Sequence, residues 1–214
     1  TEGSDGSQSN ATYSNQMVRL SPSGSSGDSA YSMVPVNHRG SPIPAAGFTL
    51  TKLSPSTANV SGIITQQANF VLLGGHTGTA FINMSTAAIW SLPEESWGYV
   101  QIQMAGRGGT VADIESRSGH TAVLNAEGNK IVVLGGWVGD LSTPADPQLL
   151  ILDTGTGYGG DAPWHWTVPE KQPTGNGIYG HGAALLPGNV MMVYGGHAIP
   201  AAPSSKMSSQ AIGP

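Results

Sequence analysis

Apolar residues along the chain occur in short runs that are bounded by Gly, Pro, Asn or Ser. The clearest runs are Phe70–Leu73, Ile131–Leu134 and Val190–Tyr194, and they are rich in the β-branched, aromatic and aliphatic residues that strands favour. The apolar positions do not recur at the spacing of about 3.6 residues that marks a helix. The pattern therefore predicts an all-β chain of short strands joined by turns.

Each of the three runs ends in a pair of glycines, and the pairs recur at a nearly constant spacing. The pairs are Gly74-Gly75, Gly135-Gly136 and Gly195-Gly196. Successive pairs lie 61 and 60 residues apart. A second marker, Gly119-His120, recurs as Gly180-His181 at a step of 61 residues. Two features in register indicate an internal repeat.

Each repeat is predicted to contain four strands. The Gly-His dipeptides each open a short apolar run, Thr121–Leu124 or Ala183–Leu186. His120 and His181 are expected to hydrogen-bond backbone at the start of these strands. Beyond the first two glycine pairs lies another strand-like run followed by a tryptophan: Ala87–Leu92 with Trp97, then Gln148–Leu152 with Trp164 or Trp166. Short strands that repeat at tens of residues are typical of a radial array of four-stranded blades.

These residues resemble the kelch repeat family, whose units carry a glycine pair at the end of the second strand and a spaced tryptophan after the third. The resemblance covers about residues 45 to 200 and implies a kelch-type β-propeller segment of three to four blades, with partial blades at both ends. The stretch His76–Trp97 is similar to kelch propellers of fungal secreted or cell-surface proteins. These propellers belong to the same superfamily as the central domain of galactose oxidase.

Both repeated features, the glycine pair and the tryptophan, have a structural interpretation. A Cβ atom on the first or second glycine would collide with a large aromatic residue of a neighbouring blade, so Gly74, Gly75, Gly135, Gly136, Gly195 and Gly196 are expected to allow a close backbone approach. Trp97 and Trp166 are expected to fill the space between blades.

The resemblance divides the chain into tails, complete blades and partial blades. Residues 1–16 and 201–214 are expected to be flexible tails, and 17–44 the end of a preceding blade. Complete blades are expected at 45–116 and 117–176, with the start of another at 177–200. Residues 137–147 are expected to be a loop insertion rich in Gly, Pro and Asp, and no further strand is expected after Gly196. We therefore expect a fragment whose remaining blades come from the same longer chain; a symmetric dimer that completes six blades is the alternative.

Composition excludes several classes of partner. The chain of 214 residues carries a formal charge of -5, which gives no electrostatic reason to bind nucleic acid. No apolar run approaches the roughly 18 residues of a membrane helix, so no membrane span is expected in this segment. The absence of cysteine excludes disulfides, thiolate metal sites and cysteine nucleophiles.

Three Asn-x-Ser/Thr acceptor sites for glycans occur in polar stretches. They begin at Asn10, Asn59 and Asn83. Because such sites are glycosylated in the secretory pathway, we expect a secreted or cell-surface glycoprotein.

The best candidate binding site is a rim made by the loops that follow the glycine pairs. His76, Trp137 and His197 occupy equivalent positions directly after the pairs, and Thr77 and Asp140 add oxygen atoms. A ligand site on this rim is predicted, with Trp137 as an anchor if its side chain is exposed; the alternative is that Trp137 is a packing residue. No metal site is predicted, because equivalent positions in different blades lie far apart.

No catalytic residues or cofactor can be assigned from the motifs. The preferred hypothesis is therefore a non-catalytic extracellular propeller that binds a protein or glycan at a cell surface or wall. One alternative is a fragment of a copper radical oxidase of the galactose oxidase type, whose catalytic residues lie outside this chain. The other is a purely structural surface glycoprotein.

Overall fold

The computed structural model describes residues 11–23, 31–104 and 114–200, and within these ranges the regular structure consists of β-strands. The strands that form the main sheet are β3 (Thr49–Lys52), β4 (Ser56–Val60), β5 (Ile63–Leu73), β6 (Thr86–Leu92), β7 (Ser96–Met104), β8 (Thr121–Leu124), β9 (Lys130–Leu134), β12 (Leu149–Asp153) and β13 (Trp164–Thr167). The described residues hold no helix with the length and hydropathy of a membrane span.

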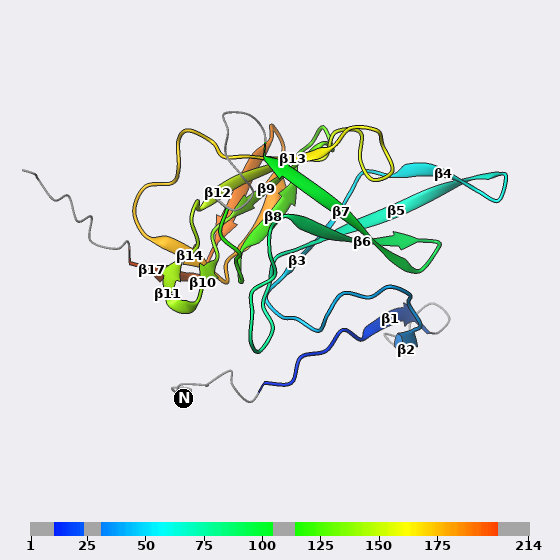
Figure 1. Ribbon diagram of the computed structural model, residues 1–214, viewed down its shortest axis with the longest axis horizontal. Helices are drawn as coiled ribbons and strands as arrows, with labels where there is room; N and C mark the ends of the chain where they lie inside the picture. The colour runs from blue at the N-terminus through cyan, green and yellow to red at the C-terminus, as the bar shows by residue number, and fades with distance from the viewer. Residues whose placement is uncertain (1–10, 24–30, 105–113, 201–214) are drawn as a thin grey trace, which may run out of the picture.

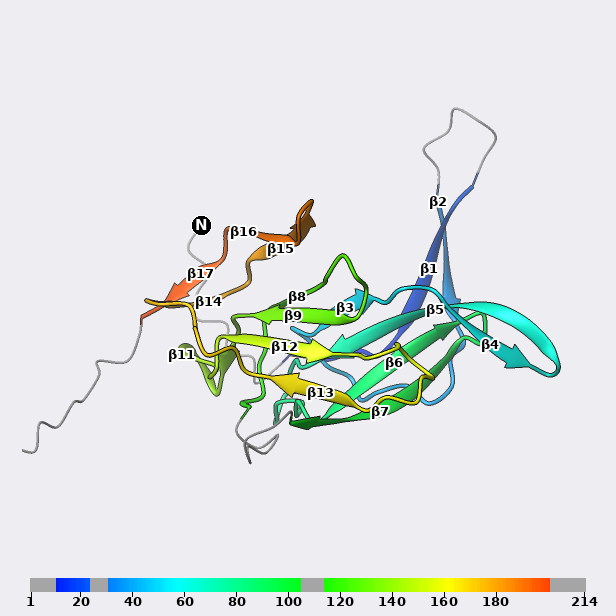
Figure 2. The same ribbon diagram turned by 90° about the horizontal axis from the view of Figure 1, so that it is seen from above.

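The main sheet is built from two groups of four strands with the same order (Figures 1 and 2). The first group runs β3-β5-β6-β7, and the second runs β8-β9-β12-β13. Neighbours within each group are antiparallel, whereas β7 and β13 pair in parallel and join the two groups. Strand β4 pairs only with the first part of β5 and forms a projecting arm.

The other ends of the two groups also meet, so the sheet nearly closes into a barrel. The hydroxyl of Thr51 on β3 donates to the carbonyl of Ala122 on β8 at 3.2 Å. Nearby, the backbone N–H of Gly119 donates to the carbonyl of Gly47 at 2.9 Å. The two groups therefore face each other across a shared interior.

That interior is the hydrophobic core. Alternate residues of β5 and β9 point into it, and Val71, Leu73, Ile131 and Val133 are fully buried. Trp166 on β13 is also fully buried, and its Nε1–H donates to the carbonyl of Met84 at 2.7 Å. The alternation of buried and exposed positions explains why these runs form strands, because a strand directs successive side chains to opposite faces.

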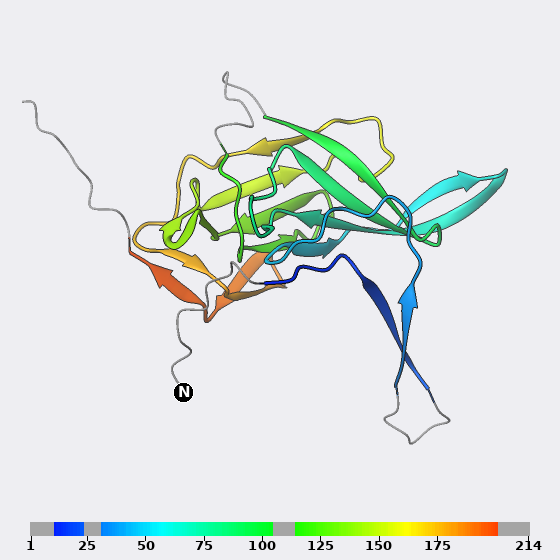
Figure 3. The same ribbon diagram turned by 60° about the horizontal axis from the view of Figure 1, so that its bottom comes forward.

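In the part of the chain that the structure describes, four further strand pairs lie outside the main sheet. They are β1 (Met17–Pro22) with β2 (Tyr31–Val36), β10 (Trp137–Val138) with β11 (Asp140–Pro144), β14 (Gly177–Tyr179) with β17 (His197–Ile199), and β15 (Gly182–Leu186) with β16 (Val190–Tyr194). Figure 3 shows the β1–β2 hairpin, in blue, projecting away from the barrel. The β15–β16 hairpin lies beside β8, as the third member of a series that begins with β3–β5 and β8–β9.

The predicted all-β class and the runs predicted to be strands are confirmed. Two predictions on local structure are wrong. Residues 137–147 were expected to be a loop insertion but contain the hairpin β10–β11, and no strand was expected after Gly196, where β17 pairs with β14. Strands β10, β14 and β17 have only two or three residues each, and β11 is mostly polar and exposed, so neither strand pair shows an alternating pattern in the sequence. The predicted tails fall largely outside the described residues, at 1–10 and 201–214.

Candidate functional site

The first two glycine pairs lie where one group of strands contacts the next, whereas no atom lies within 4 Å of the Cβ position of Gly195 in the third pair. A Cβ atom on Gly74 would lie 2.7 Å from both the Arg117 carbonyl and His120 Cε1. A Cβ atom on Gly135 would lie 2.7 Å from Cε1 of His181 and closer still to the Ile178 carbonyl. Because these separations are shorter than real Cβ contacts, only glycine fits at either position.

The same contact includes a repeated set of hydrogen bonds. The N–H of Gly75 donates to the carbonyl of Arg117, and the N–H of Gly136 donates to the carbonyl of Ile178, each at 2.8 Å. The N–H of Gly180 donates to the carbonyl of Gly119 at 2.7 Å. The glycine pairs therefore form one side of an interface between groups, and the segments around the Gly-His dipeptides form the other side.

The histidines of the Gly-His dipeptides bind threonine in the preceding group. His120 Nε2 lies 3.2 Å from the Thr49 hydroxyl, and His181 Nε2 lies 2.7 Å from the Thr121 hydroxyl. Burial, with smaller contributions from the positive charges of Arg117 and His181, lowers the pKa of His120 to about 3. Burial also lowers the pKa of His181. Both imidazoles are therefore neutral at pH 7 and act as structural links.

This geometry corrects two details of the sequence interpretation. The side chain that excludes a Cβ atom at Gly74 and Gly135 is an imidazole together with a backbone carbonyl, and not a large aromatic residue. The two histidines were expected to hydrogen-bond backbone at the start of a strand, but they bond threonine hydroxyls. Sequence spacing locates the repeat but does not show which side chains meet across it.

The residue after each glycine pair occupies an equivalent place in the structure. His76 pairs with Ala46, Trp137 with Ser118, and His197 with Tyr179. In each case the partner directly precedes the glycine that opens the next strand: Gly47, Gly119 or Gly180. These three positions define the rim of the structure.

Two of the rim residues are brought into one aromatic cluster. The rings of His76 and Trp137 are 5.1 Å apart, and Phe81 lies 5.1 Å from Trp137 in an edge-to-face arrangement. His76 Nδ1 also lies 2.8 Å from the hydroxyl of Ser118. Since both His76 and Trp137 are only 7% exposed, they support the rim from inside. His197 is not part of this cluster, and its exposed ring stacks on Tyr179 at 5.1 Å.

Thr77 and Asp140 organise the two loops that this cluster joins. The Thr77 hydroxyl accepts hydrogen bonds from the N–H groups of Thr79 and Ala80. Asp140 Oδ1 accepts from the N–H and hydroxyl of Ser142, and these bonds lower the pKa of Asp140. Both oxygens are therefore already engaged within their own loops, while Asp140 and the neighbouring Leu141 remain exposed.

The sequence matches no protein-family model, and no significant match to a curated protein was found.

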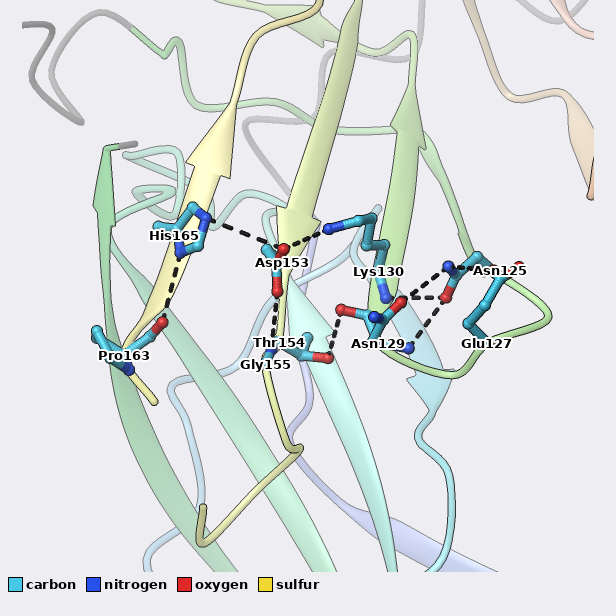
Figure 4. Close-up of polar contacts among 9 residues, drawn as sticks. All are labelled: Asn125, Glu127, Asn129, Lys130, Asp153, Thr154, Gly155, Pro163 and His165. Atoms are coloured by element: carbon cyan, nitrogen blue, oxygen red, sulfur yellow. Dashed lines mark hydrogen bonds and ion pairs between the residues drawn. The ribbon is translucent and has the colours of Figure 1, made fainter. Parts of the chain in front are cut away.

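Titratable side chains also gather at the opposite end of the second group, away from the glycine pairs (Figure 4). Lys130 at the start of β9 forms an ion pair with Asp153 at the end of β12, and His165 Nε2 lies 4.0 Å from the same carboxylate. The hydroxyl of Thr154 donates to the carbonyl of Asn129 at 3.0 Å. These bonds tie together the ends of three adjacent strands. No group of three His, Cys, Asp or Glu in the described ranges is arranged to hold a metal ion.

Two of the predicted glycan acceptors lie within the described residues, and Asn10 lies outside them. Asn59 and Asn83 are both exposed. Asn83 Oδ1 accepts a hydrogen bond from the hydroxyl of Ser85, the third residue of its acceptor triplet, at 2.6 Å. Access to both asparagines is open.

Sequence reasoning missed Arg117, which is fully buried beside the rim. Its Nη1 donates to the carbonyl of Gly135 at 3.0 Å, and burial lowers its pKa to about 10 despite the nearby carboxylates of Glu115 and Asp146. The Arg117 side chain thereby binds the glycine pair of its own group, while its carbonyl accepts a hydrogen bond from Gly75 of the first group. A lone arginine two residues before a glycine gives no sequence signal of burial, because arginine is mostly exposed in proteins.

Proposed function

We propose that this chain is a segment of a kelch-type β-propeller that serves as a non-catalytic, extracellular interaction module for a protein or glycan. The repeated four-stranded groups, their glycine pairs and the Gly-His contacts support the propeller. The nearly closed, barrel-shaped sheet is compatible with it. The kelch relationship itself rests on the sequence resemblance.

One observation carries the binding role. The loop at 76–85 and the β10–β11 hairpin are far apart in the sequence, yet the cluster of His76, Phe81 and Trp137 joins them into one surface. Loops that are fixed before a ligand arrives lose less conformational entropy on binding, so a rigid rim favours recognition. The accessible side chains of this surface include Thr77, Asp140 and Leu141, and His197 lies at the equivalent position of the next repeat.

The binding role of the rim is tested by replacing one exposed side chain on the β10–β11 hairpin. Leu141 is 50% exposed on the β10–β11 hairpin, so Leu141→Asp changes the surface without disturbing the core. The probes are an array of immobilised glycans and a displayed peptide library. We expect Leu141→Asp to weaken the binding of a recovered glycan or peptide about tenfold or more.

The matched control is Ile64→Asp, which makes the same change at a residue that is 78% exposed on β5, away from the rim. This variant should bind as the unmodified protein does. Equal binding by Leu141→Asp and the unmodified protein would show that the rim is not the site. Failure to recover any glycan or peptide would count against the binding role as a whole.

An extracellular location is supported by the accessibility of Asn59 and Asn83. Mass spectrometry of the protein from its native source should find glycans on the peptides that contain them. Asn59→Gln and Asn83→Gln should each remove one glycan mass. Unmodified peptides at both positions would contradict secretion by the glycosylating route.

A further inference from the structure

The first group of strands carries an extension that the second group does not have. Strand β5 has 11 residues, whereas the equivalent strand β9 has five. The additional part of β5, residues 63–67, pairs with β4, and together they form the arm that projects from the barrel in Figure 2. Residues 56–59 and 61–67 of this arm are exposed or half-buried. The arm therefore adds little to the hydrophobic core.

The arm has an open strand edge. Among the described strands, β4 pairs only with β5, and β6 pairs with β5 only from Ala68 to Leu72. The outer edge of β4 therefore presents backbone N–H and C=O groups to which another strand can bond. Ile63 and Ile64 at the tip are 68% and 78% exposed. An open edge beside exposed β-branched residues is a template for pairing with other molecules and for aggregation.

The usual protection of an open edge is absent from the sequence of this arm. Natural sheets prevent edge pairing with charged side chains or proline on the edge strand. Residues 56–67 contain no charged residue and no proline. The equivalent hairpin β8–β9 has Glu127 in its turn and Lys130 at the start of β9. The arm therefore needs protection of another kind.

A glycan acceptor lies on this edge strand. The acceptor triplet is Asn59-Val60-Ser61, and Asn59 on β4 is directly opposite Ile64 on β5. Residues that are directly opposite each other project from the same face of a sheet. Asn59 Oδ1 accepts a hydrogen bond from the N–H of Gly62 at 2.7 Å. This bond holds the side chain at the turn through its oxygen, and not through the amide nitrogen to which a glycan is joined.

We propose that an N-linked glycan on Asn59 covers the arm and prevents it from pairing with strands of other molecules. The inference rests on the extracellular location in the proposed function, because the glycan is added in the secretory pathway. In that step the Asn59 amide nitrogen displaces the diphosphate of a lipid-linked oligosaccharide at its anomeric carbon, and the nitrogen's proton passes to the transferase.

The size of the arm suits this role. Strand β4 has only five residues, so one bulky, hydrated sugar chain beside Ile64 covers the exposed isoleucine and much of the strand edge. The glycan thus replaces the charged side chain that protects other edge strands.

The test removes the glycan while keeping the hairpin. Ser61→Gly destroys the acceptor triplet but retains Asn59 and its bond to Gly62. Ser61 has a φ of 53°, which glycine adopts readily, so the turn is preserved. Both the variant and the unmodified protein are secreted from a host that attaches N-linked glycans, and light scattering is recorded as the concentration rises. We expect the variant to aggregate at a concentration about tenfold lower than the unmodified protein does.

Two further variants separate a specific role of Asn59 from a general effect of glycans. Ser85→Ala removes the acceptor triplet at Asn83, outside the arm, and should aggregate no more than the unmodified protein. Ile64→Asp added to Ser61→Gly places a charge on the arm and should restore solubility. Equal aggregation by Ser85→Ala and Ser61→Gly would overturn the specific role of Asn59. Aggregates of Ser61→Gly without new intermolecular β-structure in their infrared spectrum would overturn the pairing.

The outcomes also separate this proposal from the proposed function. A glycan on the Asn83 peptide with none on the Asn59 peptide would overturn the role of Asn59 but would still support secretion. A Ser61→Gly variant that stays as dispersed as the unmodified protein would overturn it as well. The rim variant Leu141→Asp lies outside the arm, so its effect on ligand binding tests the proposed function alone.

Discussion

Gly74 and Gly135 are the residues at which one group of strands meets the next. Both have a positive φ, at 60° and 74°, and both have a histidine of the next group where a Cβ atom would point. Glycine is therefore required twice over at these positions, by backbone conformation and by space. The first requirement is common in turns, whereas the second is specific to this interface.

Gly135→Val should separate these two requirements when it is compared with Gly139→Val. Gly139 has a φ of 73°, close to the 74° of Gly135, but no atom lies within 4 Å of its Cβ position. Both variants carry the same backbone strain, and only Gly135→Val adds a collision. We expect Gly135→Val to lower the free energy of unfolding by about 1–3 kcal/mol more than Gly139→Val. Denaturant titrations of the two variants measure the difference, and equal values would contradict the close contact.

His120 gives the protein a pH dependence that can be predicted in sign. Burial lowers its pKa from 6.5 to about 3 in the folded state. Between these values the unfolded chain binds a proton that the folded chain does not, so stability is fully present above pH 6.5 and falls as the pH decreases toward 3. His181 adds to the loss in the same direction.

His120→Gln should therefore flatten the dependence of the free energy of unfolding on pH below 6.5. Urea titrations from neutral pH down to about pH 4 measure this slope, because the unfolded imidazole titrates over that interval. An unchanged slope in the variant would show that His120 is not buried as a neutral group.

At the scale of elements, most strands were predictable, and the short pairs between them were not. The runs of β6, β9 and β16 are apolar enough to be recognised from sequence alone. The pair β10–β11 was not, because its strand residues Asp140 to Pro144 are mostly polar and exposed. The equivalence of His76, Trp137 and His197 could be inferred from the repeat, but their contacts could not. A sequence repeat shows which residues occupy equivalent places in the fold. It does not show their contacts, because these depend on how the neighbouring loops fold back, as the loop that brings Phe81 to Trp137 does.

The bond between β8 and the β15–β16 hairpin gives a prediction at this scale. Thr121→Val keeps the shape of the side chain but removes the hydroxyl that lies 2.7 Å from His181 Nε2. The buried imidazole then loses a partner, so we expect a loss of about 1–3 kcal/mol in the free energy of unfolding. Thr86→Val is the control, since the Thr86 bond to Gln101 is exposed. Similar losses for the two variants would show that the buried bond to His181 contributes no more to the free energy of unfolding than the exposed bond of Thr86.

At the scale of the whole molecule, the two groups share one core and are expected to unfold together. The parallel pair β7–β13 joins them on one side, and the contact between β3 and β8 joins them on the other. Trp166 lies between them and donates to the carbonyl of Met84 in the first group. Neither group can therefore bury its apolar face without the other.

Trp166→Ala should destabilise both groups equally, although the residue belongs to the second. Removing a fully buried tryptophan typically costs about 3–5 kcal/mol. Amide hydrogen exchange of β5 and β9 should speed up to the same extent, because global unfolding exposes both strands. Faster exchange confined to β9 would indicate two independent units.

The contact of the first two glycine pairs with the Gly-His dipeptides that follow them is the basis of the repeat, the fold and the proposed propeller. NMR on the labelled protein tests it directly, through cross-relaxation between the Hα protons of the glycines and the Hε1 protons of the histidines. The account predicts cross-peaks from Gly74 to His120 and from Gly135 to His181, and none from Gly139 to any histidine. Assigned spectra without the first two cross-peaks would contradict it.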